Sequence, residues 1–296
     1  MDIPNKNEIL VKDFMQRAVN APPEQDLTEL IDEAGEHFKQ ALRKQFVEAK
    51  RDFSIRMSNV GRPTCQLWMQ KHYPEKQETK PYDFLMKMLM GDAIEVIALF
   101  IMKAAGVNVQ EASGKCQLDL DGREIKGEYD LIIDDKVWDT KSTSPYSFQN
   151  KFKDFETVAS DDTFGYVSQG YGYAEATGKP FGGWIAINKV TGEWKFVEAD
   201  SSVERHNQAL GSIKETYDLI TSDKSEFERC FSDVEETYQR KPTGNRHLSR
   251  TCGYCEFKHD CWPDLVYKPS TASKARVKPW KYYTLYNEPS EGSDGV

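Results

Sequence analysis

Two aspartates and a lysine stand at the ends of two short apolar runs near the middle of the chain. Asp130 lies near the start of the first run, Tyr129 to Ile133, while Asp139 and Lys141 follow the second run, residues 136–138. Each run is typical of a β-strand, and the acidic pair at 134–135 is typical of a turn. Asp130 and Asp139 are therefore expected to meet across a hairpin, with Lys141 on the same strand face as Asp139.

These residue types suit the cleavage of a phosphodiester bond. Mg²⁺ and Mn²⁺ prefer oxygen ligands, and a site that also receives a phosphate offers few carboxylates and leaves coordination positions open. A bound cation activates water and stabilises the leaving oxygen, and Lys141 could position that water or offset charge on the phosphate. The simpler alternative is a surface hairpin with a solvated Asp and Lys, because Asp-x-Lys is common by chance.

A third carboxylate lies upstream on an expected helix. Residues 84–105 alternate apolar stretches with charges, which predicts a long, mostly buried helix, and the uncharged run 96–102 is far shorter than the roughly 18 residues of a membrane span. Glu95 sits between Ile94 and Val96, where an ionised carboxylate is costly unless it is paired or bound to a metal. It is a candidate ligand, with a Glu at the helix rim, either exposed or paired with a Lys, as the alternative.

The order of four motifs resembles that of the PD-(D/E)xK nuclease superfamily and, within it, the RecB-type exonuclease branch. The motifs span residues within 60–262 and are Gly91-x-x-x-Glu95, Gly127-x-x-Asp130, Asp139-x-Lys141 and Gln169-x-x-x-Tyr173. Many RecB-type members carry His at the position of Glu95, whereas Glu there is similar to phage-type exonucleases.

The resemblance implies a role for each matched residue. Glu95, Asp130 and Asp139 would hold Mg²⁺ or Mn²⁺, the carbonyl of Thr140 would add a ligand, and Lys141 would assist the nucleophile. Gln169 and Tyr173, one helical turn apart, would flank the catalytic strand and contact the DNA.

The cysteines give a separate signal. Cys252, Cys255 and Cys261 form a compact group, and Cys65 lies far upstream. Four such thiolates suit a structural Zn²⁺ or a [4Fe-4S] cluster, and the spacing alone does not choose between them. The pattern resembles the iron–sulfur nucleases of the AddB group and their CRISPR-associated relatives, which implies the cluster. The remaining thiols, Cys116 and Cys230, are expected to be plain buried residues.

Cationic and aromatic residues surround the cysteine group, although the chain as a whole carries a net charge of −9. Cations for phosphates combined with aromatic faces for bases are typical of a single-strand groove. The alternative is a C-terminal arm whose aromatics pack on the body, and residues 288–296, which are acidic and rich in Gly and Ser, are expected to be disordered. The predicted DNA-binding residues are Arg246, Arg250, Lys278, Trp280 and Lys281.

The remaining patterns predict the frame that positions these residues. A helix is expected over 27–49 with a core-facing apolar side, a hairpin over 182–198, and helices over 202–220 and 225–238. The order of helix, three strands, helix, two strands and helices predicts an α/β restriction-endonuclease-like core, a mixed sheet flanked by helices. Helical N-terminal and C-terminal parts would join at the iron–sulfur cluster. The expected divisions are a helical region over 1–60, the nuclease domain over 61–262 and a basic, aromatic arm over 263–296.

The sequence therefore predicts a Mg²⁺- or Mn²⁺-dependent DNA exonuclease that acts on single- or double-stranded ends in recombination, repair or phage DNA processing. The alternative is a non-catalytic DNA-binding or recombination accessory protein with a structural zinc or iron–sulfur site. A single-strand annealing protein or a helicase is an expected partner, and because no GxxxxGK[ST] loop occurs here, a helicase would be a separate subunit. No signal peptide or membrane span is recognised, so a cytoplasmic location, in a bacterial or phage-infected cell, is expected.

Overall fold

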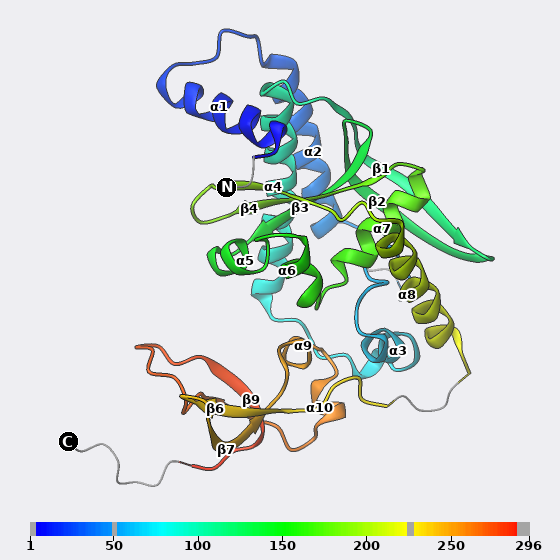
Figure 1. Cartoon of the computed structure of the whole chain (residues 1–296), viewed down its shortest axis with the longest axis vertical. Coiled ribbons are helices and arrows are strands. Elements are labelled where there is room, and N and C mark those ends of the chain that lie inside the picture. Colours follow the sequence, from blue (N-terminus) through cyan, green and yellow to red (C-terminus); the bar gives the residue numbers. More distant parts are fainter. Residues whose placement is uncertain (1–3, 49–51, 224–227, 289–296) are drawn as a thin grey trace. The chain divides into compact units, whose positions relative to one another are not determined.

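The computed structural model describes residues 4–48, 52–223 and 228–288, and the chain divides into two compact units (Figure 1). Unit 1 comprises Met1–Arg62 and Pro81–Thr221, and unit 2 comprises Pro63–Lys80 and Ser222–Val296. These divisions differ from those expected at residues 60 and 262. The reason is that residues 63–80 bind the C-terminal stretch, where the side-chain amides of Gln66 and Gln77 donate hydrogen bonds of 2.8 and 3.0 Å to Glu256.

Unit 1 is built on a five-stranded mixed sheet with the strand order β1-β2-β3-β4-β5. Strands β3 and β4 are parallel and the other neighbours are antiparallel. The predicted mixed sheet flanked by helices is therefore confirmed at this level (Figure 1). The strands are β1 Val109–Leu120, β2 Arg123–Ile133, β3 Lys136–Thr143, β4 Phe181–Asn188 and β5 Trp194–Glu198.

The helices of unit 1 come before, within and after the sheet. A parallel strand pair requires a crossover connection, and three helices form it between β3 and β4. The crossover helices are α5 Pro145–Asn150, α6 Phe155–Ser160 and α7 Tyr166–Thr177, and the others are α1 Lys6–Asn20, α2 Thr28–Phe46, α4 Tyr82–Ala104 and α8 Val203–Thr221.

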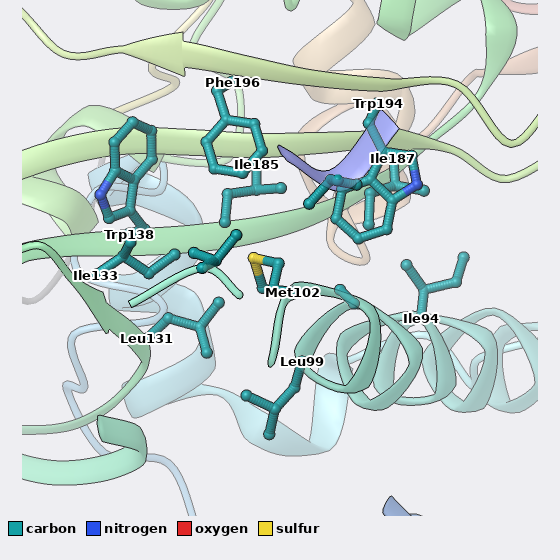
Figure 2. Close-up of a cluster of buried hydrophobic side chains, with 13 residues drawn as sticks. Ile94, Leu99, Met102, Leu131, Ile133, Trp138, Ile185, Ile187, Trp194 and Phe196 are labelled. Carbon is teal, nitrogen blue, oxygen red and sulfur yellow. The ribbon is translucent and has the colours of Figure 1, made fainter. Parts of the chain in front are cut away.

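Helix α4 packs its C-terminal half against the sheet. Ile94, Leu99 and Met102 belong to a buried cluster with residues of β2 to β5, including Trp138 and Phe196 (Figure 2). Fully burying each large aliphatic side chain contributes about 1.5–3 kcal/mol, so this cluster fixes α4 beside β3. The N-terminal half of α4 is more exposed than the predicted, mostly buried helix.

Helix α2 does not bury the apolar side that the sequence predicts for residues 27–49. Only Ala41 of this helix is buried, whereas Ile31, Phe38 and Phe46 are exposed. The helix is instead attached to α4 partly by polar contacts, such as the 3.0 Å ion pair between Lys44 and Asp92. The core-facing prediction is wrong for most of these residues, because their apolar side chains stay exposed while α2 meets α4 partly through ion pairs such as Lys103 with Glu33.

The β2–β3 hairpin closes with the turn that its sequence predicts. Asp134 and Asp135 both have positive φ, 50° and 59°, which is the conformation of a type I′ turn. Asp tolerates this conformation better than branched residues do. The turn fixes the register Leu131↔Trp138 and Ile133↔Lys136.

The described residues of unit 2 form a four-stranded antiparallel sheet with the order β6-β7-β9-β8 and four short helical segments. The predicted arm over 263–296 thus contributes two strands to this sheet, and its last residues, 289–296, lie outside the described residues. The strands are β6 Val234–Tyr238, β7 Lys241–His247, β8 Val266–Pro269 and β9 Trp280–Leu285; the helical segments are α3 Thr64–His72, η1 Pro74–Lys76, α9 Arg250–Gly253 and α10 Lys258–Cys261.

A buried carboxylate organises this sheet. Glu236 of β6 is 1% exposed, and it lies where a helix over 225–238 was predicted. That prediction is wrong for 234–238, because Gln239 and Arg240 adopt positive φ and form a hairpin turn with β7; residues 224–227 lie outside the described residues. The carboxylate of Glu236 accepts hydrogen bonds from Ser270, Tyr283, Asn245, Thr271 and Lys281.

Candidate functional site

The β2–β3 hairpin brings Asp130 and Asp139 to neighbouring strands, as predicted. Continuing the register from Leu131↔Trp138 places the two aspartates opposite one another. One carboxylate oxygen of Asp130 accepts a 2.7 Å hydrogen bond from the backbone N–H of Thr140. The hairpin therefore gathers two carboxylates at one position of the sheet.

Lys141 completes this group from the same strand. Its Nζ lies 2.6 Å from Oδ2 of Asp139, as expected for residues two apart on one strand face. Burial by itself lowers the pKa of Lys141, but the charges of Asp139, Tyr166 and Asp130 outweigh this effect and raise the pKa. Lys141 is therefore a cation at neutral pH.

Asp139 has an incompletely satisfied carboxylate. The residue is 2% exposed, and within the described part of the chain its buried Oδ1 has no hydrogen-bond partner. Burial raises the pKa of Asp139, and Lys141 opposes that increase. A buried acceptor without a donor is destabilising, so this oxygen is suited to a ligand that supplies positive charge.

Glu95 of α4 lies within electrostatic range of the same group. Desolvation by the surrounding protein raises the pKa of Glu95 to about 7, Lys141 and Lys44 oppose this change, and Asp92 and Asp139 add to it. The desolvation is only partial, because the residue keeps exposed surface that water reaches. Burial, with the nearby charges of Glu95 and Asp139, also raises the pKa of Asp130 well above its ordinary value.

The side chains of this group are of the type that a hard divalent cation prefers. Glu95, Asp130 and Asp139 offer carboxylate oxygens, and a cation would relieve both their mutual repulsion and the unpartnered Oδ1 of Asp139. Among residues 4–48, 52–223 and 228–288, however, no three His, Cys, Asp or Glu side chains are arranged to hold a metal. The predicted ligand role of the Thr140 carbonyl stays a prediction.

Helix α7 places Gln169 and Tyr173 beside this group. The Nζ of Lys141 donates a 3.4 Å hydrogen bond to Oε1 of Gln169, and Gln169 in turn shares a hydrogen bond with Tyr173. Tyr173 is 2% exposed, and its predicted contact with DNA stays a prediction. Its ring packs on Gly127, where an added Cβ would lie 2.7 Å from Cε1 of Tyr173.

An aromatic residue that the sequence patterns did not indicate lies next to Lys141. The ring centroid of Tyr166 lies 4.5 Å from Nζ of Lys141 and 4.8 Å from Nζ of Lys151. Asp162 accepts the backbone N–H of Tyr166 at 2.7 Å and so fixes the start of α7. Tyr166 precedes Gln169 by one helical turn, which is the signal that could have identified it, whereas no local pattern indicates Lys151.

The cysteines of unit 2 are paired differently from the prediction. Cys65 and Cys230 form a disulfide with a Cα–Cα distance of 5.9 Å, so the expectation that Cys230 is a plain buried thiol is wrong; it is exposed. Cys252, Cys255 and Cys261 are free and close enough to interact. Burial, with the charges of Glu256, Cys261 and Cys252 adding, raises the pKa of Cys255 to about 12.

In unit 1, Cys116 is a half-buried thiol, and burial raises its pKa to about 11. The predicted plain thiol is therefore partly accessible.

The predicted DNA-binding residues differ in their exposure and in whether an acidic residue already pairs with them. Arg246 pairs with Asp233 at 2.7 Å and Lys281 with Glu236 at 3.2 Å, so the charges of both are compensated within their own sheet. Lys278 and Trp280 are exposed, and Arg250 is exposed at the start of α9.

The chain has a distant structural likeness to a solved protein. No protein-family model and no curated protein matches the chain. The crystal structure of SSO0001 is similar, with 15% sequence identity over 82% of this chain and 100% of that chain, at a TM-score of 0.43. None of the helices in the described residues has the length and apolar character that crossing a membrane requires.

Proposed function

We propose that the chain is a Mg²⁺- or Mn²⁺-dependent DNA exonuclease of the PD-(D/E)xK type, with unit 1 as its restriction-endonuclease-like core. The observation that carries this proposal is the buried carboxylate of Asp139, which has one oxygen 2.6 Å from Lys141 and the other without a donor in the described residues. Asp130 on the neighbouring strand and Glu95 on α4 supply two further carboxyl groups, and desolvation and nearby acidic groups raise the pKa of both. Carboxyl groups with such perturbed pKa values are typical of functional sites.

Each residue of the site has a part in the proposed reaction. Asp130, Asp139 and Glu95 would hold the cation, which when bound supplies Lewis acidity toward the phosphate and a lower pKa for the attacking water. Lys141, kept protonated by Asp139, offsets negative charge that develops on the phosphate. Gln169 accepts a hydrogen bond from Lys141 and so orients its ammonium.

The hydrolysis assay uses linear DNA labelled at its 5′ or 3′ end, with and without Mn²⁺, and a circular substrate to distinguish exonuclease from endonuclease action. Asp139→Asn keeps the side-chain shape but removes the charge, and we expect it to slow hydrolysis by at least roughly 100-fold. Lys141→Ala should have a similar effect. The matched control is Asp135→Asn, which makes the same change at the exposed turn of this hairpin. Hydrolysis by Asp139→Asn at the wild-type rate would refute the site.

We further propose that unit 2 holds a [4Fe-4S] cluster through Cys65, Cys252, Cys255 and Cys261, with Zn²⁺ as the alternative. The proposal is supported by the proximity of the three C-terminal thiols and by Cys65 belonging to the same unit. Assembly requires the disulfide between Cys65 and Cys230 to be reduced, because that bond occupies the fourth thiol.

The test of this ligand set is purification under anaerobic, reducing conditions followed by iron and zinc analysis. Wild type and Cys230→Ser should contain iron and absorb at about 400 nm, whereas Cys252→Ser should lose both. A colourless wild type with stoichiometric zinc would favour the alternative.

A further inference from the structure

Strands β8 and β9 carry three aromatic rings on one side of the unit 2 sheet: Tyr267, Trp280 and Tyr282, here called the aromatic face. The antiparallel register pairs Tyr267 with Tyr282 and Pro269 with Trp280. Residues directly opposite in an antiparallel pair share a face, as do alternate residues along one strand. The Tyr267 ring lies 5.1 Å from the Trp280 ring and 4.6 Å from the Tyr282 ring, tilted by 38° and 31°.

The aromatic face is open, whereas the opposite face of the same strands is closed. Tyr267 is 52% exposed and Trp280 is 54% exposed. On the other side, Tyr283 is fully buried, and both it and Lys281 donate hydrogen bonds to Glu236. The sheet therefore has a structural side, held by Glu236, and a side that presents aromatic surface to solvent. Exposed aromatic residues grouped in this way indicate an interaction surface.

The charge around this face favours an anionic partner. Residues 266–286 contain five cationic side chains and no acidic one, in a chain whose net charge is −9. Arg276 and Lys278 are exposed on the segment that joins β8 to β9 at the Trp280 end of the face. At the other end the Nζ of Lys258 lies 5.0 Å from the centre of the Tyr282 ring, although Glu78 also pairs with this lysine.

We propose that the aromatic face binds single-stranded DNA, with unpaired bases stacking on Trp280 and Tyr267 and phosphates contacting Arg276 and Lys278. Every base has a flat π-face that can stack on an aromatic ring, which requires no particular sequence. Bases of a duplex are stacked on each other and do not offer this surface, so the face selects single strands. The inference rests on the proposed function only in taking DNA as the substrate, and it assigns that substrate's class.

Binding is measured by fluorescence anisotropy with labelled oligo(dT), oligo(rU) and a duplex in EDTA, which prevents metal-dependent hydrolysis. Trp280→Ala and Tyr267→Ala should each weaken oligo(dT) binding roughly 5- to 150-fold, as for the loss of one stacked base. Trp280→Phe, which keeps a ring, should bind within a few-fold of wild type. Tyr82→Ala is the matched control, because it removes an aromatic ring that is exposed in unit 1.

Salt dependence separates phosphate contacts from stacking. Lys278→Gln should reduce the slope of log affinity against log salt by about 0.7, while Trp280→Ala should leave the slope unchanged. Wild-type affinity in both alanine variants, equal affinity for duplex and single strand, or tighter binding of oligo(rU) than of oligo(dT) would each overturn the proposal. Loss of binding in Trp280→Phe as well would point to misfolding, and hydrogen exchange of β9 peptides decides this.

The two proposals fail separately. Oligo(dT) binding that depends on Trp280, without hydrolysis in Mn²⁺, refutes the nuclease proposal and supports DNA binding by the aromatic face. Hydrolysis that depends on Asp139, with unchanged oligo(dT) binding by Trp280→Ala, supports the nuclease proposal and refutes DNA binding by the aromatic face.

Discussion

Replacing Glu236 with glutamine should destabilise the four-stranded sheet of unit 2 by about 3 kcal/mol at neutral pH. Burial raises the pKa of this carboxyl, but hydrogen bonds from Ser270, Asn245, Tyr283 and Thr271 outweigh it and lower the pKa to about 2, from an ordinary 4.5. The difference between these two pKa values sets the size of the expected loss. A glutamine amide would also direct a donor group toward hydroxyl donors.

The pH dependence of this stabilisation has a definite sign. Because the pKa of Glu236 is lower in the folded protein, its contribution is complete above the ordinary pKa and decreases as the pH falls toward 2. At pH 3.5 about 2 kcal/mol of the contribution should remain. In Glu236→Gln this part of the pH dependence should be absent.

The measurement is urea unfolding at several pH values, followed by hydrogen exchange of peptides from β6 to β9, so that unit 2 is observed separately from unit 1. Glu235→Gln is the matched control, because it makes the same change at the neighbouring, exposed residue of β6. The reasoning is refuted if the two variants are equally stable, or if the difference between wild type and Glu236→Gln is the same at pH 6 and pH 3.5.

Three further changes test other contacts. Gly127→Ala should cost about 1–3 kcal/mol, because its Cβ would lie within 2.7 Å of Tyr173, whereas Gly211→Ala, where the added Cβ meets nothing within 4 Å in the described structure, should be neutral or stabilising in thermal unfolding. Tyr166→Leu should slow DNA hydrolysis while Tyr166→Phe restores it, since the ring packs against the Lys141 ammonium; equal rates for the two variants would exclude this role. Cys230→Ser should lower the free energy of unfolding of the oxidised chain in urea by about 2–4 kcal/mol, because it removes a disulfide. The variant and the wild type should be equally stable once both are reduced.

Local sequence patterns were sufficient to predict the β2–β3 hairpin at the centre of unit 1. Strand alternation and turn chemistry act over a few residues, so the hairpin, the opposition of Asp130 to Asp139 and the position of Lys141 followed from the sequence. The same patterns failed for β6, because the buried Glu236 interrupts the apolar alternation that marks a strand. The crossover between two parallel strands brings the Tyr166 ring against Lys141 and places Lys151 against that ring, and no short-range pattern in the sequence indicates such contacts.

The division of unit 2 into two stretches of chain has a consequence during synthesis. The hydrogen bond between Gln66 and Glu256 cannot form until Glu256 is synthesised, 190 residues later. The contact between Glu78 and Lys258 likewise requires a residue that follows 180 residues later. At about 5–20 residues per second, this interval lasts roughly 10–40 s. All five strands of the unit 1 sheet are therefore synthesised before Glu256, the hydrogen-bond partner of Gln66 in α3. Cys230 follows Cys65 by 165 residues, so for most of this interval the thiol of Cys65 is carried unpaired on the nascent chain, open to cellular reductants, oxidants and metal-delivery proteins.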